Sequence, residues 1–151
     1  MRGDSVSLDD LLFDEAELLA ATGRVGVDLS GVEPVVVHGE RAALVRLTRN
    51  LVDNAARHAT ERVALSTSTD HGQAVLVVAD DGPGIDPADR SRIFERFTRL
   101  DEARARDAGG SGLGLAIVER IARDHDATVE VLDSDSGGAK FVVRFPADGA
   151  A

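Results

Sequence analysis

The residues best placed to do chemistry are Asp80-Asp81-Gly82-Pro83-Gly84-Ile85, which follow an apolar run over residues 74–79. The apolar run predicts a buried strand, so Asp80 is expected at the end of that strand. The two glycines permit positive φ angles and close approach of another molecule to the backbone, while Pro83 stiffens the turn. An ionised carboxylate only accepts hydrogen bonds, so its natural partner is a donor such as an exocyclic amine. A tight turn with solvated carboxylates explains the same residues when they are taken alone.

A second polar group lies on the long helix that the sequence predicts over residues 40–59. Successive helical residues turn by about 100°, so Asn50, Asn54 and Arg57 fall on one stripe. The opposite side is apolar and is expected to face the core; it carries Leu44, Leu51, Val52 and Ala55. Two carboxamide oxygens one turn apart suit a hard cation that is already bound to phosphate. Because Asn is a poor helix former, we prefer this interpretation to two asparagines by chance on a polar face.

A glycine-rich block, Gly110-Ser111-Gly112-Leu113-Gly114-Leu115, opens the helix predicted over residues 113–124. The free N–H groups and the positive dipole end of such a helix attract anions, and glycines let phosphate reach the backbone. The block lacks the Gly-Lys-Ser/Thr of a P-loop and the glycine register of a dinucleotide-binding fold. Residues 100–110 before it have no periodicity and end in two glycines, which predicts a mobile loop.

These three blocks and a fourth, Ile93-Phe94-Glu95-Arg96-Phe97, follow the order of the N, G1, F and G2 boxes of the histidine-kinase ATP-binding domain. The chain resembles that domain over residues 25–146, within the superfamily shared with gyrase B, the Hsp90 chaperones and MutL. The resemblance implies ATP and Mg²⁺ as ligands. It makes Asp80 the acceptor of the adenine amino group, with Gly82 and Gly84 beside the base, and it makes Asn54 the Mg²⁺ ligand.

The resemblance also assigns the other site residues by position. Asn50 supports Asn54 and counts with it as catalytic, and Arg57 stands where a basic residue contacts phosphate. His58 stands near the nucleotide, although the helix dipole explains a C-terminal histidine equally well. Phe94 is explained better by core packing. The remaining nucleotide-binding positions are Ile85, Phe97, Gly110, Ser111, Gly112, Leu113, Gly114 and Leu115.

Asn50 also separates a kinase from a hydrolase. The ATP-hydrolysing members of the superfamily carry a Glu one turn before the metal-binding Asn, as the general base for water, and Asn50 cannot take a proton at neutral pH. The resemblance therefore implies a protein histidine kinase. The γ-phosphoryl group would go to a His on a separate dimerisation and phosphoacceptor domain, and indirectly to a response regulator. A serine kinase of the anti-sigma-factor type and a non-catalytic nucleotide-binding regulatory module are the alternatives.

Composition narrows the possible partners. A length of 151 residues, of which 43% are hydrophobic, predicts one globular domain. A net charge of −10 argues against binding to nucleic acid or to an anionic membrane. The absence of cysteine excludes disulfides and thiolate metal sites, and no apolar run approaches the roughly 18 residues of a spanning helix. We expect a cytoplasmic domain, without direct membrane contact, of a membrane-anchored sensor kinase.

The order of helical and extended patterns predicts an α/β fold, a two-layer sandwich with a mixed sheet and helices on one face, as in the Bergerat-type ATP-binding fold. Strands are expected over residues 25–29, 35–38, 62–69, 73–79, 128–132 and 139–145, and a short helix over 86–94. Ser7-Leu8-Asp9-Asp10 predicts a capping box at the start of a helix that ends near Ala20. We expect a truncated linker and this helix in residues 1–24, the ATP-binding domain in 25–146 and a frayed tail in 147–151. Nothing before residue 25 supplies a phosphoacceptor His, so the sequence is interpreted as a module of a longer kinase.

Overall fold

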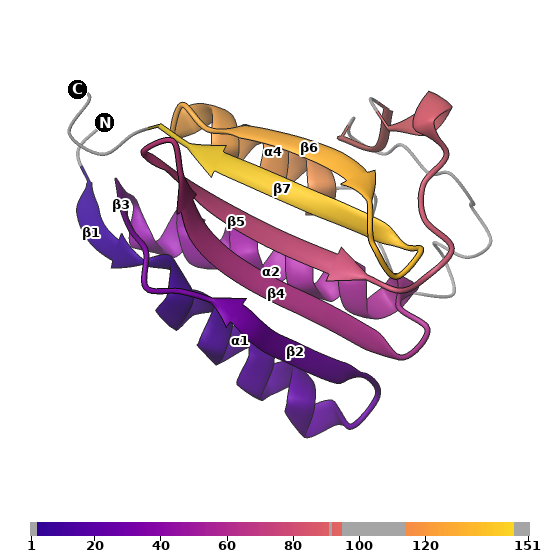
Figure 1. Ribbon diagram of the computed structural model, residues 1–151. Coiled ribbons are helices and arrows are strands. Elements are labelled where there is room, and N and C mark those ends of the chain that lie inside the picture. The colour runs from indigo at the N-terminus through magenta and orange to yellow at the C-terminus, as the bar shows by residue number, and fades with distance from the viewer. Residues whose placement is uncertain (1–2, 91, 95–113, 147–151) are drawn as a thin grey trace.

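The computed structural model describes residues 3–90, 92–94 and 114–146 (Figure 1). Its helices are α1 (Leu8–Thr22), α2 (Arg41–His58) and α4 (Gly114–Asp124), with two short 3-10 turns, η1 (Pro87–Asp89) and η2 (Arg92–Phe94). Its strands are β1 (Asp4–Ser7), β2 (Gly26–Val32), β3 (Val36–Gly39), β4 (Arg62–Asp70), β5 (Gln73–Asp80), β6 (Thr128–Asp133) and β7 (Ala139–Phe145).

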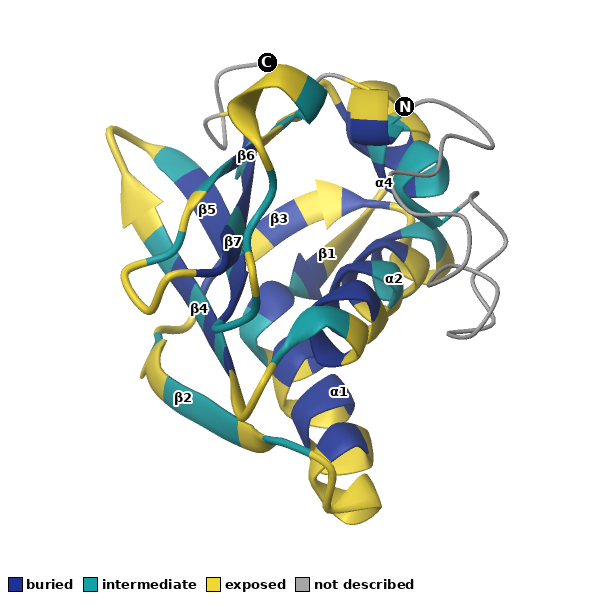
Figure 2. Cartoon of the chain, turned by 90° about the vertical axis from the view of Figure 1, so that its right-hand side faces the viewer, coloured by how far each residue is buried: buried dark blue, intermediate teal, exposed yellow. Residues whose placement is uncertain are grey.

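The main sheet has five strands in the order β2-β4-β5-β7-β6. Strand β2 runs parallel to β4, whereas the pairs β4–β5, β5–β7 and β6–β7 are antiparallel, so the sheet is mixed. The three helices lie on one face of this sheet, and buried residues fill the space between the two layers (Figures 1 and 2). The predicted two-layer α/β fold is confirmed. A second, two-stranded antiparallel sheet joins β1 and β3.

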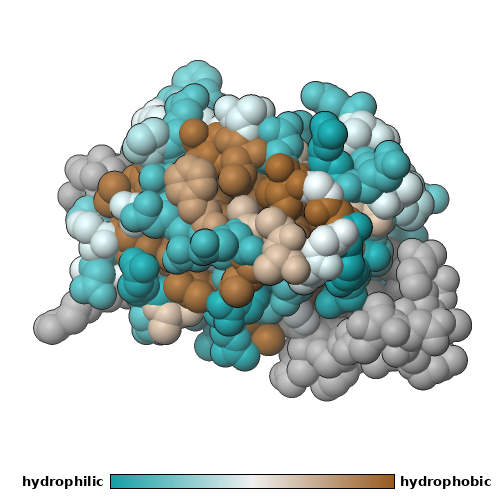
Figure 3. Space-filling model, turned by 90° about the horizontal axis from the view of Figure 1, so that it is seen from below, coloured by the Kyte–Doolittle hydropathy of each residue, from teal (hydrophilic) through white to brown (hydrophobic). Residues whose placement is uncertain are grey.

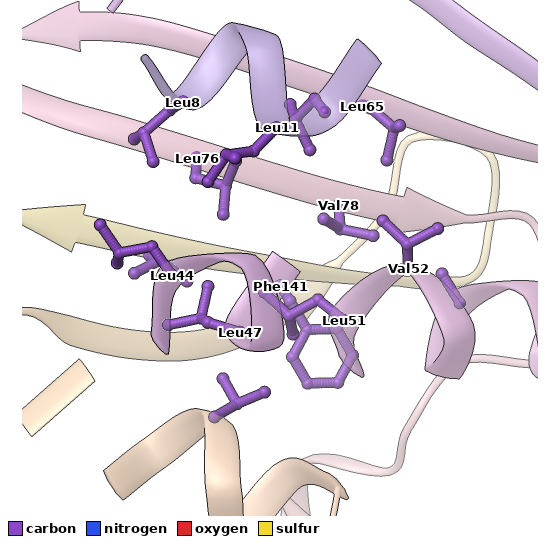
Figure 4. Packing of buried hydrophobic residues seen from close by; sticks show 14 of the residues in the cluster. Leu8, Leu11, Leu44, Leu47, Leu51, Val52, Leu65, Leu76, Val78 and Phe141 are labelled. Carbon is purple, nitrogen blue, oxygen red and sulfur yellow. The ribbon is translucent and has the colours of Figure 1, made fainter. Parts of the chain in front are cut away.

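The core forms where alternate residues of the strands meet the apolar sides of the helices. Leu65, Val78 and Phe141 lie opposite one another across β4, β5 and β7 and are almost completely buried. Leu47 and Leu51 of α2 lie near Phe141, whereas Leu65 lies on the side of α1 (Figure 4). Full burial of one such side chain is favourable by about 1.5–3 kcal/mol, so this layer holds α2 firmly against the sheet.

The N-terminal segment differs from the predicted linker and capping box. Residues 4–7 form β1, in which Ser7 lies opposite Val36 of β3. Ser7 is the N-cap of α1, but its side chain makes no capping hydrogen bond. The Asp9 carboxylate instead accepts a hydrogen bond from the Val35 N–H at 3.0 Å. Pairing with β3 therefore fixes the start of α1, and this segment is part of the folded unit.

The region after β5 also departs from the prediction. A helix was expected over residues 86–94, but the described part of this segment contains the two 3-10 turns η1 and η2. The Asp86 side chain accepts from the Ala88 N–H and begins η1, while Ile93 in η2 is buried. The predictions of a mobile loop over residues 100–110 and a frayed tail over 147–151 lie outside the described residues.

The surface over α1 and β2 has an apolar area in its middle, bordered by hydrophilic residues (Figure 3). On the molecule as a whole, the exposed large apolar side chains of the described residues are Phe13, Leu18 and Val36. None of the described helices is both long enough and apolar enough to cross a bilayer.

Candidate functional site

Asp80 is the last residue of β5, a strand that pairs with β4 on one side and with β7 on the other. Its side chain lies on the helix-facing side of the sheet because Leu76, Val78 and Asp80 alternate along the strand. The residue is only 2% exposed. Its Oδ1 accepts hydrogen bonds from the Gly82 N–H at 2.8 Å and the Ala139 N–H at 3.3 Å. Two backbone donors therefore fix a buried carboxylate at the end of the sheet.

Asp81, the next residue, makes different contacts from those of Asp80. Its two carboxylate oxygens accept hydrogen bonds from the backbone N–H groups of Thr60, Glu61 and Arg62, at 2.8 to 3.1 Å. These bonds, first the one from Glu61, hold the pKa of Asp81 below its ordinary value. Asp81 therefore fastens the loop between α2 and β4. The sequence could separate the two acids only by family spacing, and the structure separates them by their contacts.

Gly82 is needed for packing inside the chain. A Cβ atom at Gly82 would lie 2.0 Å from the carbonyl oxygen of His58 at the end of α2. The backbone of α2 thus occupies the Cβ side of Gly82, and the place of Gly82 beside a bound base stays a prediction. Gly84 has a φ angle of 80°, a conformation that favours glycine. Gly82 thus lets the turn after β5 approach the C-terminal end of α2, whereas a Cβ atom at Gly84 would lie 3.3 Å from the carbonyl oxygen of Gly137 in the turn between β6 and β7.

Gly138 was missed by the sequence analysis. It lies in the turn between β6 and β7, and a Cβ atom there would be 2.3 Å from both the carbonyl oxygen and Oδ1 of Asp80. The Ser136 hydroxyl also donates to the Asp80 carbonyl oxygen at 3.2 Å. The only signal in the sequence was the Asp-Ser-Gly-Gly turn, which predicts a hairpin but not the strand end that it touches. Figure 1 shows this hairpin beside the end of β5.

The polar residues of α2 divide into a buried and an exposed group. Asn54 is 6% exposed, although the periodicity placed it away from the apolar side of the helix, and α2 packs against α4 as well as against the sheet. Asn50 is half-buried, and its Nδ2 is buried without a hydrogen-bond partner. Arg57 is exposed and His58 is half-buried. The predicted apolar side is confirmed, since Leu44, Leu51, Val52 and Ala55 are all buried.

The unpartnered atom of Asn50 indicates a place for a ligand. A buried donor without an acceptor costs about 1–3 kcal/mol, so such an atom calls for a reason. Rotation of the carboxamide by 180° would place an oxygen there instead. The described residues contain no group of three or more His, Cys, Asp or Glu side chains that could hold a metal ion. A cation at α2 would therefore be coordinated by carboxamide oxygens together with phosphate oxygens of a bound ligand. Mg²⁺ typically binds in this way, with few protein ligands and the remainder from phosphate and water.

The glycine block is described only from Gly114 onwards, where α4 begins. Gly114 and Leu115 form the first turn of α4, which contains no acidic residue. Phe97, Gly110, Ser111, Gly112 and Leu113 lie outside the described residues. Before this gap, Phe94 packs edge-on against Phe141 with ring centroids 6.1 Å apart, as expected for a core residue. Ile85 is half-buried and packs against the core.

The described site residues thus converge on one end of the molecule, which faces the viewer in Figure 2. Asp80, Gly82 and Gly84 come from the end of β5 and the following turn, and the carbonyl of His58 touches this turn. Asn54 and Asn50 lie about one and two turns before His58 on α2. Within the described residues, the arrangement offers a buried acceptor, a pair of carboxamides and a helix N-terminus. It can accept a hydrogen bond from a base and bind an anion through a cation or through backbone N–H groups.

Known proteins resemble this chain in sequence. A family model for histidine kinase-, DNA gyrase B- and HSP90-like ATPases matches residues 39–149. The probable sensor histidine kinase TcrY of Mycobacterium tuberculosis is 44% identical over 119 residues, which cover 78% of this chain and 25% of that protein. The sensor histidine kinase CpxA of Escherichia coli is 41% identical over 113 residues, which cover 75% of this chain and 25% of CpxA. The chain thus spans about a quarter of the length of these relatives.

Solved structures show the same fold. The mycobacterial sensor histidine kinase MprB superposes with a TM-score of 0.82 at 30% identity, covering 95% of this chain and 97% of that one. The ATP-binding domain of PrrB from Mycobacterium tuberculosis gives a TM-score of 0.81 at 27% identity, covering 99% of this chain and all of that chain. Full-length ShkA in complex with AMPPNP gives a TM-score of 0.79 at 30% identity, covering 99% of this chain and 32% of ShkA.

Proposed function

The chain belongs to the family of histidine kinase-, DNA gyrase B- and HSP90-like ATPases, and we propose that it is the ATP-binding catalytic domain of a sensor histidine kinase. It binds Mg·ATP and transfers the γ-phosphoryl group to a His on a separate dimerisation and phosphoacceptor domain. The observation that carries this proposal is the buried Asp80 carboxylate at the end of β5, a strand that packs against the asparagine-bearing helix α2. The nucleotide-binding unit is residues 25–146, with α1 packed against it.

Asp80 selects the base. Its Oδ1 already accepts from two backbone N–H groups, and the carboxylate has a second oxygen for the 6-amino group of adenine. Guanine presents a carbonyl oxygen at the corresponding position, which a carboxylate repels. The fixed position of Asp80 at the end of β5 therefore favours adenine. Ile85 and His58 would flank the nucleotide, and Gly84 would leave room beside the base.

The asparagines and the helix N-terminus would hold the phosphates. Asn54 and Asn50 fit a Mg²⁺ ion, because their carboxamides are neutral oxygen donors and one polar atom of Asn50 lacks a partner. Bound Mg²⁺ supplies positive charge to the phosphate oxygens. Arg57 is exposed and reaches the solvent side of α2, where it would meet a phosphate. The glycine block from Gly110 to Leu115 would present its N–H groups to the same anion.

Transfer rather than hydrolysis follows from the residues on α2. The nucleophile is an imidazole nitrogen of the acceptor His, which forms a bond to the γ-phosphorus while the bond to the β,γ-bridging oxygen breaks and ADP leaves. Catalysis of this step consists mainly of positioning and charge neutralisation. Asn50 occupies the position of the base that activates water in the hydrolases of the superfamily, and a carboxamide cannot serve as that base. The curated relatives are sensor histidine kinases, so the serine-kinase alternative is not favoured.

The test uses radiolabelled ATP, this chain, and the dimerisation domain of the same kinase supplied separately. We expect label on one His of the dimerisation domain, in an acid-labile form, only when both pieces are present. The response regulator would then remove that label. A control with the acceptor His replaced by Gln should stay unlabelled. Label on this chain alone, or fast phosphate release without the partner, would refute the proposal and favour a hydrolase.

A further inference from the structure

We infer that Arg90 is a positioning residue for the adenine site: its guanidinium ties the turn after β5 to the β6–β7 hairpin, and both of these hold Asp80. The inference rests on the proposed function, because it gives Arg90 a part in nucleotide binding without contact to the nucleotide. Arg90 lies directly after η1, ten residues beyond Asp80 in the sequence.

Arg90 makes two contacts that join distant parts of the chain. Its Nε donates to the carbonyl oxygen of Ile85 at 3.2 Å, and its Nη2 donates to Oδ1 of Asp133 at 2.6 Å. The Arg90 side chain is only 22% exposed, although it is charged, whereas Asp133 is 83% exposed. A planar guanidinium with several donors in fixed directions can hold both partners at once, which a lysine cannot do.

The first contact acts through the turn after β5. Ile85 ends the segment that begins at Gly82, and the Gly82 N–H donates to Oδ1 of Asp80 at 2.8 Å. Asp81 fastens the start of this segment to the loop after α2. Arg90 fastens its end at the Ile85 carbonyl. The turn is thus held at both ends, and the Gly82 donor stays directed at the Asp80 carboxylate.

The second contact acts through the β6–β7 hairpin. Asp133 lies directly opposite Ala139 in the pairing of these two strands, and the Ala139 N–H is the second donor to Oδ1 of Asp80. The hairpin is closed by a hydrogen bond from the Ser134 N–H to the Gly138 carbonyl at 2.7 Å. Gly138 touches Asp80 so closely that no side chain fits there. Any displacement of Asp133 would therefore move Ala139 and Gly138 relative to Asp80.

Both routes lead from Arg90 to the same carboxylate oxygen. A surface ion pair with a highly exposed carboxylate contributes little to stability by itself. The pair of Arg90 and Asp133 matters instead because it keeps the Gly82 and Ala139 N–H groups directed at Asp80. If these donors move, the Asp80 carboxylate rotates with them and no longer faces the base. Loss of Arg90 is therefore expected to weaken nucleotide binding more than it lowers the stability of the fold.

The test measures ADP binding by calorimetry for the parent chain, Arg90→Gln, Asp133→Asn and the double variant. We expect Arg90→Gln to raise the Kd for ADP roughly three- to tenfold, and the two changes together to cost less than the sum of their separate effects, as for contacting residues. Arg92→Gln is the matched control. Arg92 lies two residues further on and pairs with Asp89 at 3.6 Å, within its own segment, with its side chain 57% exposed.

A second readout needs no nucleotide. Hydrogen exchange of the Gly82 and Ala139 amides should be faster in Arg90→Gln than in the parent, and unchanged in Arg92→Gln. Equal ADP affinity in the parent and Arg90→Gln, an equal loss in Arg92→Gln, or strictly additive effects of Arg90→Gln and Asp133→Asn would overturn the inference. A parent chain that does not bind ADP would refute the proposed function instead, and the amide exchange would still decide whether Arg90 positions Asp80.

Discussion

Replacing Asp80 by Asn separates the two tasks of its carboxylate, fixing the strand end and recognising the base. The Asn side chain has nearly the same shape and keeps one oxygen, which can still accept from the N–H groups of Gly82 and Ala139. The other oxygen becomes an NH₂ group, which is a donor. In the proposed site this donor would face the amino group of adenine, so the bond is lost while the protein keeps its local contacts.

The magnitude follows from the kind of bond that is lost. A hydrogen bond to a charged group contributes about 1.5–3 kcal/mol, and 1.4 kcal/mol corresponds to about a factor of ten in affinity. Asp80 is 2% exposed, so water does not replace the missing acceptor. We therefore expect the Kd for ADP to rise roughly 10- to 150-fold. Guanine offers a carbonyl oxygen to the new donor, so the preference for ADP over GDP should fall by more than the affinity for ADP.

The assay is calorimetric titration with ADP and with GDP, together with thermal unfolding of each variant. Asp81→Asn is the control for base specificity: among the described residues Asp81 bonds only to the loop of residues 60–62, so its loss can loosen the turn and weaken ADP and GDP together. Its ratio of ADP to GDP affinity should equal that of the parent. The reasoning fails if Asp80→Asn binds ADP as tightly as the parent, or if its ADP-to-GDP ratio is unchanged while the protein remains folded.

Two further predictions concern α2 and the loop that follows it. Asn54→Ala should weaken the Mg²⁺-dependent part of ADP binding and leave metal-free ADP binding nearly unchanged, as measured by titration with and without Mg²⁺; equal losses would make Asn54 structural. Asp81→Asn should lower the urea midpoint at neutral pH. Because hydrogen bonds lower the pKa of Asp81 in the folded state, its stabilisation is complete above the unfolded value of about 4 and is lost as the pH falls through the folded pKa. The difference between parent and variant should therefore disappear in acid, and a difference independent of pH would contradict this account.

The sequence predicted most of the fold because the strongest patterns are local. The apolar run of β5 is continuous, as is typical of a central strand, and the helical stripe of Leu44, Leu51 and Val52 faces the core as expected. The short strand β1 was missed because its four residues carry no periodic pattern. It exists through pairing with β3, about 30 residues away, and a long-range partner leaves no local signal.

The candidate site could be predicted by residue type but not by contact. Asp80 and Asp81 are adjacent acids, and their different tasks depend on the loop after α2 and on the β6–β7 hairpin, both remote in the sequence. Periodicity on one helix placed Asn54 away from the core, but it could not account for burial by elements other than the sheet, and α2 also contacts α4. Gly138 was missed for the same reason, since its need for a bare backbone arises from contact with Asp80.

The residues that break the ordinary rules of burial come from β5 and α2, two elements in contact, and this is the physical argument for a ligand at this end of the sheet. A buried carboxylate such as Asp80 is costly to desolvate, and two backbone donors to one of its oxygens compensate only part of that cost. Asn50 adds a buried polar atom without a partner on the neighbouring helix. A stable fold tolerates such costs where function requires them. A ligand with an amine at one end and a cation-bound phosphate chain at the other would provide a partner for both the Asp80 carboxylate and the Asn50 carboxamide.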